Sequence, residues 1–440
     1  MAREMKDSGV EWISEIPVDW NIKRNKQLFD EVNDRCENGN EHMLLSVSEY
    51  YGIAPKSEKV SDGEFETRAE SLDGYKLCKV EDIVMNIMLA WKRSTGRSAY
   101  DGIVSPAYCV YRKKADIDTK YYHYLFRTDI VADLFKRYST GIIDSRLRLY
   151  PDKFMSLNMV VPPYDEQCQI AEYLDQQCVY IDSVIEKTKV SIEEYKKLKQ
   201  AVITQAVTQG VRGNREMKDS GIEWIGKVPS EWDLVRFRHV LKERQEKNSP
   251  VKSTERLSLS IDLGVTLYSE KTTNLDRFKE DFEQYKLAHI GDLVMNSMNM
   301  IVGASGVSDY YGCVSPVYYT YYDEIEDHVT AKYCEYVFRS KAMLRVLYSL
   351  GKGIYAIVRG DDRVNTCRLK VSKEDLKNII LPIPSILEQR EIVNYLKAKC
   401  TEIDNLIAKK EQYLAEVENY KKSLIYEYVT GKREVPETWA

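Results

Sequence analysis

Two stretches of the chain repeat apolar residues at intervals of three, four or seven, with charged residues between them. The repeat continues over residues 166–205 and again over residues 388–427, which is the pattern of a coiled coil. Each stretch predicts a helix about 60 Å long, at 1.5 Å per residue. Neither helix could bury its apolar stripe alone in water, so we expect the two to pack against each other in antiparallel orientation. The stripe residues are Ile170, Leu174, Cys178, Ile181, Ile185, Ile192, Tyr195 and Val202, and then Ile392, Leu396, Cys400, Ile403, Ile407, Leu414, Val417 and Leu424.

The rest of the chain has a mixed pattern. Runs rich in valine and tyrosine, residues 104–111 and 314–322, predict strands. Residues 121–138 and 331–350 predict helices. We therefore expect an α+β fold, in which two mixed α/β domains are separated by two long helices that form an antiparallel coiled coil. The expected parts are a first mixed domain 1–163, a first long helix 164–212, a second mixed domain 213–384, a second long helix 385–431 and a tail 432–440.

The two mixed domains are copies of one another. Residues 3–24 and 215–236 are identical at thirteen of 22 positions, and further matches follow in the same order along both halves. This order indicates duplication of a whole domain, not repetition of a short motif. Residues 435–439 repeat a Pro-x-x-Trp pattern found near the start of each copy. We expect from this echo that the end of the chain packs beside its start.

Composition narrows the class of protein. The 440 residues carry a net charge of −5, and 43% of them are hydrophobic, which is enough for real cores. No apolar run approaches the roughly 18 residues of a membrane span, and no secretory signal is evident. Nine cysteines without a C-x-x-C pair argue against a disulfide framework and a zinc cluster. We expect a cytoplasmic protein without a membrane partner. The acidic balance leaves DNA binding open, because basic residues can cluster locally.

Two segments that resemble catalytic motifs lack a key residue. Residues 161–164 read Val-Pro-Pro-Tyr, and the Asn that would bind a flipped adenine in an Asn-Pro-Pro-Tyr methyltransferase motif is replaced by Val161. Residues 221–227 fit most of a P-loop, but Val228 stands where the magnesium-binding Ser or Thr belongs. No catalytic set occurs in both halves. We therefore expect a binding protein that is not an enzyme and needs no cofactor or metal.

A basic segment of the first domain is a candidate for contact with DNA. Residues 91–97 read Trp-Lys-Arg-Ser-Thr-Gly-Arg and are expected in a loop between strands. Lys92, Arg93 and Arg97 suit phosphate contacts and bidentate reading of guanine. The matching residues 301–307 carry no charge. Two readers of different sequences would differ in this way, although a solvated loop is the alternative for each residue.

A pair of cations separated by one leucine occurs in both copies. Alternation would place the two cations on one face of a strand. Because both copies share the pair, phosphate positioning fits it better than base reading, and a solvent-facing edge strand is the alternative. An insertion in the second copy adds two further arginines. The shared candidates are Arg146 with Arg148 and Arg368 with Lys370, and the inserted candidates are Arg359 and Arg363.

The ends of the predicted long helices carry a recognisable signature. The entries read Pro-Pro-Tyr-Asp-Glu-Gln at 162–167 and Pro-Ser-Ile-Leu-Glu-Gln at 384–389, and the exits read Ala-Val-Thr-Gln-Gly at 206–210 and Tyr-Val-Thr-Gly-Lys at 428–432. Together with the Asp-Ile-Val-Met-Asn and Ser-Pro-x-Tyr segments of the first domain, they resemble the specificity subunits of type I restriction-modification systems from end to end. The departures are small and lie at Ser385, Leu387 and Gln209.

This resemblance implies a function. Each mixed domain would be a target-recognition domain that reads one half of a bipartite site in double-stranded DNA. The helices would fix the spacer between the half-sites and hold two methyltransferase subunits, which supply S-adenosylmethionine binding and adenine chemistry. The resemblance also allows restriction subunits as partners.

Two other functions stay open at this point. One is an enzyme with fused methyltransferase activity, against which the replaced Asn at Val161 argues. The other is a protein-binding coiled-coil scaffold, whose domains would show no salt-dependent affinity for DNA.

Overall fold

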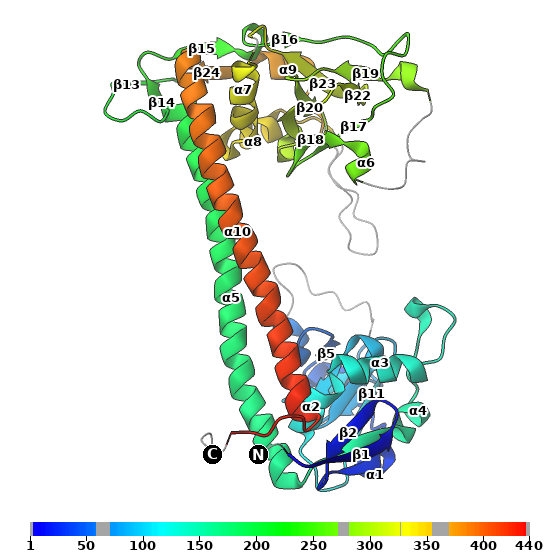
Figure 1. Ribbon diagram of the computed structural model, residues 1–440. Helices are drawn as coiled ribbons and strands as arrows, with labels where there is room; N and C mark the ends of the chain where they lie inside the picture. Colours follow the sequence, from blue (N-terminus) through cyan, green and yellow to red (C-terminus); the bar gives the residue numbers. More distant parts are fainter. Residues whose placement is uncertain (1–2, 59–70, 272–280, 326, 354–368, 437–440) are drawn as a thin grey trace. The chain divides into compact units, whose positions relative to one another are not determined.

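The computed structural model describes residues 3–58, 71–271, 281–325, 327–353 and 369–436, and its contacts divide the chain into two units. Unit 1 comprises Met1–Lys189 with Gln412–Ala440, and unit 2 comprises Val190–Glu411. Each unit contains one mixed region together with part of both long helices, which are α5 (Tyr164–Gln209) and α10 (Ile386–Val429) (Figure 1).

The mixed region of unit 1 is built around a four-stranded antiparallel sheet of order β4-β11-β8-β9, with two-stranded ladders around it. Its strands are β1 (Met5–Val10), β2 (Ile13–Pro17), β3 (Asn21–Arg24), β4 (Phe29–Val32), β5 (Leu45–Ser48), β6 (Gly52–Pro55), β7 (Lys76–Cys78), β8 (Ile83–Asn86), β9 (Thr95–Arg97), β10 (Gly102–Val104), β11 (Tyr108–Lys113) and β12 (Asn158–Val161). Its helices are α1 (Asn25–Leu28), α2 (Thr119–Phe126), α3 (Asp129–Tyr138) and α4 (Pro151–Ser156), with 3-10 turns η1 (Gly39–Glu41), η2 (Lys56–Glu58), η3 (Ala90–Lys92) and η4 (Asp144–Arg146).

The mixed region of unit 2 repeats this plan, with a four-stranded antiparallel sheet of order β16-β23-β20-β21. Its strands are β13 (Met217–Asp219), β14 (Lys227–Pro229), β15 (Asp233–Arg236), β16 (Lys242–Glu243), β17 (Leu257–Ser260), β18 (Gly264–Leu267), β19 (Lys286–Ala288), β20 (Leu293–Asn296), β21 (Ser305–Val307), β22 (Gly312–Val314), β23 (Tyr318–Tyr322) and β24 (Ile380–Ile383). Its helices are α6 (Tyr268–Lys271), α7 (Val329–Arg339), α8 (Lys341–Leu350) and α9 (Lys373–Asn378), with 3-10 turns η5 (Phe237–His239), η6 (Phe282–Gln284) and η7 (Met300–Val302).

Alternation along the central strands divides each sheet between two cores. In β11, Cys109 and Tyr111 enter the large core of unit 1, whereas Val110 enters a smaller core on the other face. In β20, Leu293 and Met295 enter the large core of unit 2, and the residue between them enters the smaller one. Side chains of a strand point alternately to opposite faces, so one short apolar strand can serve two cores.

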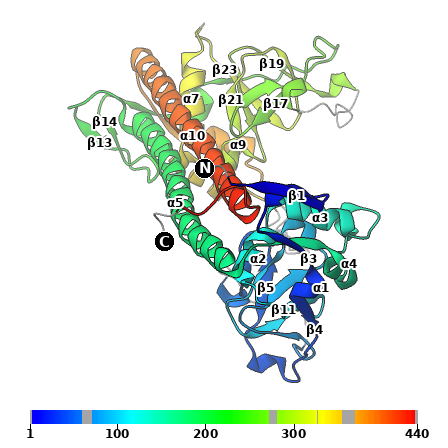
Figure 2. The ribbon, with the colours of Figure 1, turned by 60° about the horizontal axis from the view of Figure 1, so that its bottom comes forward.

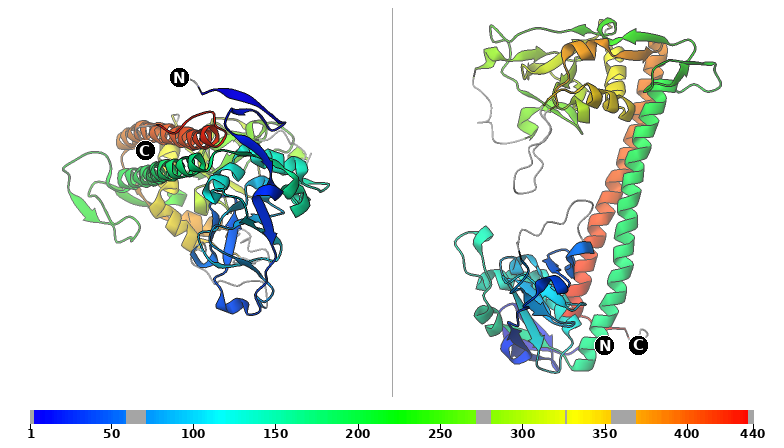
Figure 3. Two further views of the ribbon diagram at one scale, coloured as in Figure 1. Left: turned by 90° about the horizontal axis from the view of Figure 1, so that it is seen from below. Right: turned by 180° about the vertical axis from the view of Figure 1, so that it is seen from behind.

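The two long helices lie side by side within each unit and run antiparallel (Figure 3). In unit 1, Lys421 of α10 donates to Asp182 of α5 at 2.6 Å. In unit 2, Lys199 of α5 donates to Asp404 of α10 at 2.7 Å. All sixteen predicted stripe residues are buried or half-buried. The predicted α+β fold with two packed long helices is therefore confirmed.

Several local predictions were wrong in detail. The run predicted as one strand over 104–111 is two strands, because Ser105 and the following proline form a turn between β10 and β11. The run 314–322 divides in the same way. The single helix predicted over 121–138 breaks at Arg127 and Thr128, and that over 331–350 breaks at Ser340, whose hydroxyl caps α8. Short polar residues of this kind favour helix starts over helix interiors.

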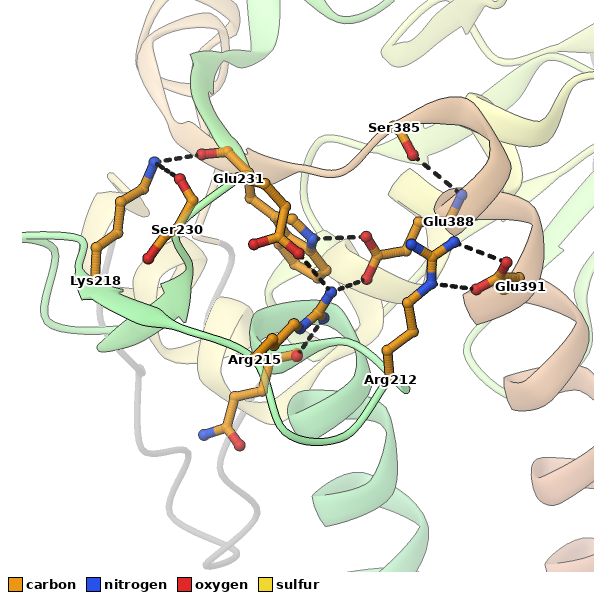
Figure 4. A network of polar contacts seen from close by, with 10 residues as sticks. Arg212, Arg215, Lys218, Ser230, Glu231, Ser385, Glu388 and Glu391 are labelled. Carbon is orange, nitrogen blue, oxygen red and sulfur yellow. Dashed lines mark hydrogen bonds and ion pairs between the residues drawn. The ribbon is translucent and has the colours of Figure 1, made fainter.

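A charged clasp closes the entry of each long helix. In unit 2, Arg215 donates to the Glu388 carboxylate at 2.6 Å and to the Gln209 carbonyl oxygen at 2.6 Å, so it links the start of α10 to the end of α5 (Figure 4). Trp232 donates its indole N–H to the same carboxylate at 3.0 Å. Glu388 is nearly fully buried, and these donors compensate its charge.

The corresponding clasp of unit 1 joins the two ends of the chain. Arg3 and the Trp20 indole donate to Glu166, at 2.5 and 2.8 Å. Arg3 also lies 3.6 Å from a Glu434 carboxylate oxygen. A Cβ added at Gly431 would lie 2.5 Å from the Pro17 side chain. Figure 2 shows strand β1 beside the end of α10 in this unit. The expected packing of the chain's end beside its start is confirmed.

Candidate nucleic-acid interface

The first basic segment follows β8 and has the same backbone in both copies. The Asn86 side chain accepts from the Met88 N–H at 3.1 Å, and Asn296 accepts from Met298 at the same distance. A 3-10 turn follows in each copy, η3 and η7. The next residue is left-handed in both, Arg93 with φ of 65° and its counterpart, a glycine, with φ of 94°. The segment is thus a turn between two strands, as expected, except that its last residues, Thr95–Arg97, belong to strand β9.

The exposed position of this turn differs between the copies. Lys92 is exposed in unit 1, and the matching Val302 is 49% exposed in unit 2. Two ammonium groups lie close to the Trp91 ring, that of Lys92 at 5.1 Å and that of Lys136 at 5.0 Å from its centroid. Contacts of this kind hold a lysine near an aromatic face without removing it from solvent.

The second basic segment closes a loop between α3 and α4. Thr140 and Arg148 exchange two backbone hydrogen bonds of 2.9 and 3.0 Å. Arg146 and Arg148 are exposed, whereas Leu147 between them is buried. The predicted alternation holds, but the predicted strand was wrong, because Arg146 ends the 3-10 turn η4 and Arg148 makes only an isolated bridge.

The same closure occurs in unit 2. Lys352 and Lys370 exchange backbone hydrogen bonds of 3.0 and 2.9 Å, and Lys370 is exposed next to the buried Leu369. Lys370 therefore occupies the place of Arg148. The remaining candidates of the second copy lie outside the described residues; they are Arg359, Arg363 and Arg368.

Lys136 of α3 brings the two basic segments of unit 1 together. Its ammonium lies over Trp91 and also donates to Asp144 of η4 at 2.9 Å. The backbone N–H of Leu149 in turn donates to the Ile87 carbonyl oxygen at 2.9 Å. The cations on these joined segments, which we name the basic surface, are Lys92, Lys136, Arg146 and Arg148.

Arg93 and Arg97 are engaged elsewhere. Arg93 pairs with Asp129 at 2.7 Å and lines a cavity of about 410 Å³ against α10 of unit 1. Arg97 is largely buried and donates to Thr119 at 3.2 Å and to Glu81 at 3.4 Å. Both guanidinium groups are therefore engaged with partners outside the two basic segments.

The sequence interpretation missed an arginine that supports the first turn. Arg127 donates to the backbone carbonyl oxygens of Arg93 and Thr95, both at 2.9 Å, and to three carbonyls of residues 48–50. Burial, together with the charge of Arg93, lowers its pKa to about 10. In unit 2 the matching Arg339 shares only the contact with the preceding loop, where it donates to the Ile261 carbonyl oxygen at 2.7 Å, and it pairs with Glu335 at 3.1 Å. The signal that could have found this pair is the repeat of Phe-Arg before Thr128 and Ser340.

Within the ranges that the structure describes, no helix combines the length and apolarity needed to cross a membrane. Over the same ranges, histidine, cysteine and acidic side chains form no group able to hold a metal ion.

Known proteins resemble the chain over nearly its whole length. No family model matches it. Two proteins of Methanocaldococcus jannaschii, MjaX and MjaVIII, are each 22% identical to it, over 96% and 95% of the chain and 95% and 93% of their own lengths. They are named, the first provisionally, as specificity subunits of type I restriction enzymes.

Solved structures share the fold. A chain from work on complex assembly and conformational transition of the type I restriction-modification system matches with a TM-score of 0.66 at 14% identity, covering 95% of this chain and 99% of that one. The HsdS subunit from Thermoanaerobacter tengcongensis matches with a TM-score of 0.50 at 15% identity, covering 95% and 98%. The solved structures share the fold of this chain, and its near-full-length relatives identify it as a specificity subunit of a type I restriction-modification system.

Proposed function

We propose that the two mixed regions each read one half of a bipartite sequence in double-stranded DNA. The observation that carries this proposal is the pair of exposed residues Lys92 and Val302, which differ within the same backbone frame. Base edges are distinguished by the donors, acceptors and apolar groups that meet them. A constant frame with a different side chain at its exposed position therefore suits two readers of different half-sites.

The recognition domains in this proposal are residues 1–163 and 213–384, followed by spacer helices 164–212 and 385–431 and a tail 432–440. Strand β12 ends at Val161 and α5 begins at Tyr164, which supports the first boundary. Strand β24 ends at Ile383 and α10 begins at Ile386, which supports the second.

The exposed cations that the two copies share would position the DNA backbone. Arg148 and Lys370 occupy equivalent bridges, and neither donates from its side chain to another described residue. Cations that bind phosphates fix the register of a protein on DNA without reading its sequence. Lys92, Arg146 and Lys136 add to this positive charge in unit 1, and Arg93 and Arg97 remain candidates for base contacts.

The long helices would hold two methyltransferase subunits, because an exposed apolar residue recurs at one matching position of both helices. Leu198 is 48% exposed in unit 2, and Tyr420, which matches it, is 54% exposed in unit 1. Apolar residues that recur on the outside of a helix pair suit two copies of one protein partner. Restriction subunits would join as further partners in the cytoplasm, where the DNA lies.

Specificity subunits are the non-catalytic members of these systems, so the chain is not an enzyme. S-adenosylmethionine and the adenine chemistry would belong to its methyltransferase partners. A chain of this kind acts by bringing those partners to a chosen sequence.

The proposal can be tested in the assembled complex by sequencing modified DNA from cells with and without the full chain. We expect a bipartite methylated motif that depends on the chain. Replacing Arg93 and Arg97 with alanine should change one half of the motif only, and each lost base contact should weaken the binding free energy by roughly 1–3 kcal/mol.

The length of the helices should set the spacer between the half-sites. Adding one turn of about four residues to both helices should lengthen the spacer by one or two base pairs, at 1.5 Å per residue and about 3.4 Å per base pair.

Two results would contradict the proposal. Arginine variants that changed both half-sites equally would show that the domains do not read separately. A complex whose DNA affinity did not fall as salt rises would support a protein scaffold in place of a DNA reader.

A further inference from the structure

The loop between α3 and α4 presents an apolar tip that the fold does not use. Ile142 is 97% exposed and its neighbour Ile143 is 54% exposed. Two adjacent isoleucines that stay in water forgo the free energy that burial would give them. Neighbouring exposed apolar residues often mark an interaction site.

The loop holds this tip in a defined place. The paired backbone bonds between Thr140 and Arg148 close its base. A Cβ added at Gly141 would lie 2.6 Å from the Arg146 carbonyl oxygen, so the chain folds back closely on itself. The ion pair of Lys136 with Asp144 ties the loop to α3. A tip that is ordered before binding loses less conformational entropy when a partner arrives.

The backbone pair that closes the base of the loop occurs in both copies, whereas the segment that it encloses differs in length and sequence. In unit 2 the closing pair is Lys352 with Lys370, and Val371 donates to the Ser297 carbonyl oxygen as Leu149 donates to Ile87. The closed segment spans 140–148 in the first copy and 352–370 in the second. A constant base that closes segments of different length and sequence suits a part that determines specificity.

The charges beside the tip select a polyanion. Arg146 and Arg148 are exposed within the same loop, and among the described residues no carboxylate pairs with either guanidinium. Phosphates on both sides of a DNA groove would pair with them. The apolar group that base pairs offer in the major groove is the thymine C5-methyl.

We propose that Ile142, supported by Ile143, contacts thymine methyl groups in the major groove of the first half-site while Arg146 and Arg148 bind the flanking phosphates. This inference rests on the proposed DNA-reading function and assigns the chemistry of one of its contacts. It makes the first half-site dependent on at least one A·T pair.

The test uses the complex of the full chain with its methyltransferase subunits and duplexes in which each thymine of the first half-site is replaced in turn by deoxyuridine. This replacement removes only the methyl group. For the unchanged complex we expect the affinity to fall about fourfold at the contacted thymine, the value of one buried methyl. Ile142→Ala should bind the natural duplex more weakly and should no longer respond to that replacement, whereas Ile142→Val should still respond. Val80→Ala, at a residue of unit 1 that is 46% exposed, is the matched control and should behave as the unchanged chain.

The outcomes separate this inference from the proposed function. Sequence-specific binding with the same deoxyuridine response in Ile142→Ala would overturn the inference alone, and so would a first half-site without thymine. Loss of methyltransferase binding in Ile142→Ala would assign the tip to a protein partner. If Ile142→Ala lost the ability to bend DNA but kept its response to deoxyuridine, the tip would instead act as a wedge in the minor groove. A complex without any sequence preference would overturn the proposed function as well.

Discussion

The hydroxyl of Tyr121 donates a hydrogen bond to the backbone carbonyl oxygen of Val429, 2.7 Å away, at the C-terminal end of α10. The last carbonyls of a helix have no partner within the helix, and a buried one needs a donor. Tyr333 makes the matching contact with Val207 at the end of α5, at 3.1 Å. The Val-Thr signature at the two helix exits is therefore the place where each mixed region holds the end of a long helix.

Removing this hydroxyl should destabilise unit 1. Tyr121→Phe leaves the buried Val429 carbonyl oxygen without its donor, and we expect the free energy of unfolding to fall by about 1–3 kcal/mol. Urea denaturation of the full chain measures the change. Tyr138→Phe, at a residue that is 43% exposed, is the control and should have little effect. Equal stability of the two variants would show that the contact does not hold the helix end.

The clasp at the entry of α10 gives a second prediction. Side chains of Arg215 and Glu388 are 12% and 2% exposed, and removal of one partner from a buried pair typically costs about 3–5 kcal/mol because the other charge is left unpaired. We expect Glu388→Ala to destabilise unit 2 towards the lower end of that range in urea denaturation, because Arg215 keeps its more exposed partner Glu231 at 3.2 Å.

Glu391 provides a matched comparison one turn further along α10. It pairs with Arg212 at 2.8 Å on the surface, where solvent screens the charges (Figure 4). Glu391→Ala should leave the midpoint of unfolding almost unchanged. A loss as large as that of Glu388→Ala would mean that burial does not set the strength of the clasp.

The sequence predicted those parts of the molecule that depend on periodic burial. Ile170 and Ile392 begin the two apolar stripes and are both almost fully buried, because a repeat of three and four residues marks one face of a helix directly. The duplication was equally visible, and it predicted that the second unit repeats the plan of the first.

Contacts between distant segments were not predictable in this way. Asp82 pairs with Arg112 of β11, at 2.9 and 2.8 Å, whereas the matching Asp292 pairs with Arg244, which follows β16. The two copies thus neutralise the equivalent buried carboxylates with arginines from different segments, and strand register decides which arginine can reach each one.

The candidate site shows the same limit. Charge and spacing identified Arg93 and Arg97, but nothing local in the sequence indicates that Asp129 and Thr119 lie beside them. Lys92 of the same segment and Arg148 of the second basic segment face solvent. Composition can therefore nominate cations, whereas packing decides which of them are free to meet a ligand.

The His123 imidazole makes the stability of unit 1 dependent on pH. Its Nδ1 accepts the Arg97 backbone N–H at 3.1 Å, and burial lowers its pKa to about 3. The unfolded imidazole takes up a proton near pH 6.5. Its contribution to stability is therefore complete above pH 6.5 and is lost progressively as the pH falls towards 3, by up to about 1.4 kcal/mol per pH unit.

We expect His123→Gln, which keeps an acceptor for Arg97, to reduce the fall in unfolding free energy between pH 7 and pH 5. The matching residue of unit 2 is Glu335, which accepts the Val307 backbone N–H at 3.2 Å and whose pKa burial raises. Acid has the opposite effect on stability there, because a carboxyl group whose pKa is raised in the folded state favours that state at low pH. Glu335→Gln should therefore not reduce the acid sensitivity. If His123→Gln left the pH profile unchanged, this imidazole would not be the source of the sensitivity.

The exposed turn position offers an exchange between the copies. Lys92→Val gives the first turn the side chain of the second, and Val302→Lys does the reverse; both positions face solvent, so neither change disturbs a core. If each turn meets its own half-site, Lys92→Val should alter or weaken recognition of the first half-site alone, and Val302→Lys should act on the second alone. Methylated motifs from cells that carry each variant provide the measurement. If Lys92 binds a phosphate, its loss would also make the fall of log affinity with log salt concentration shallower, by about 0.9 in slope. Variants that each changed both halves of the motif would be incompatible with separate readers, and variants that changed neither would remove this position from the DNA interface.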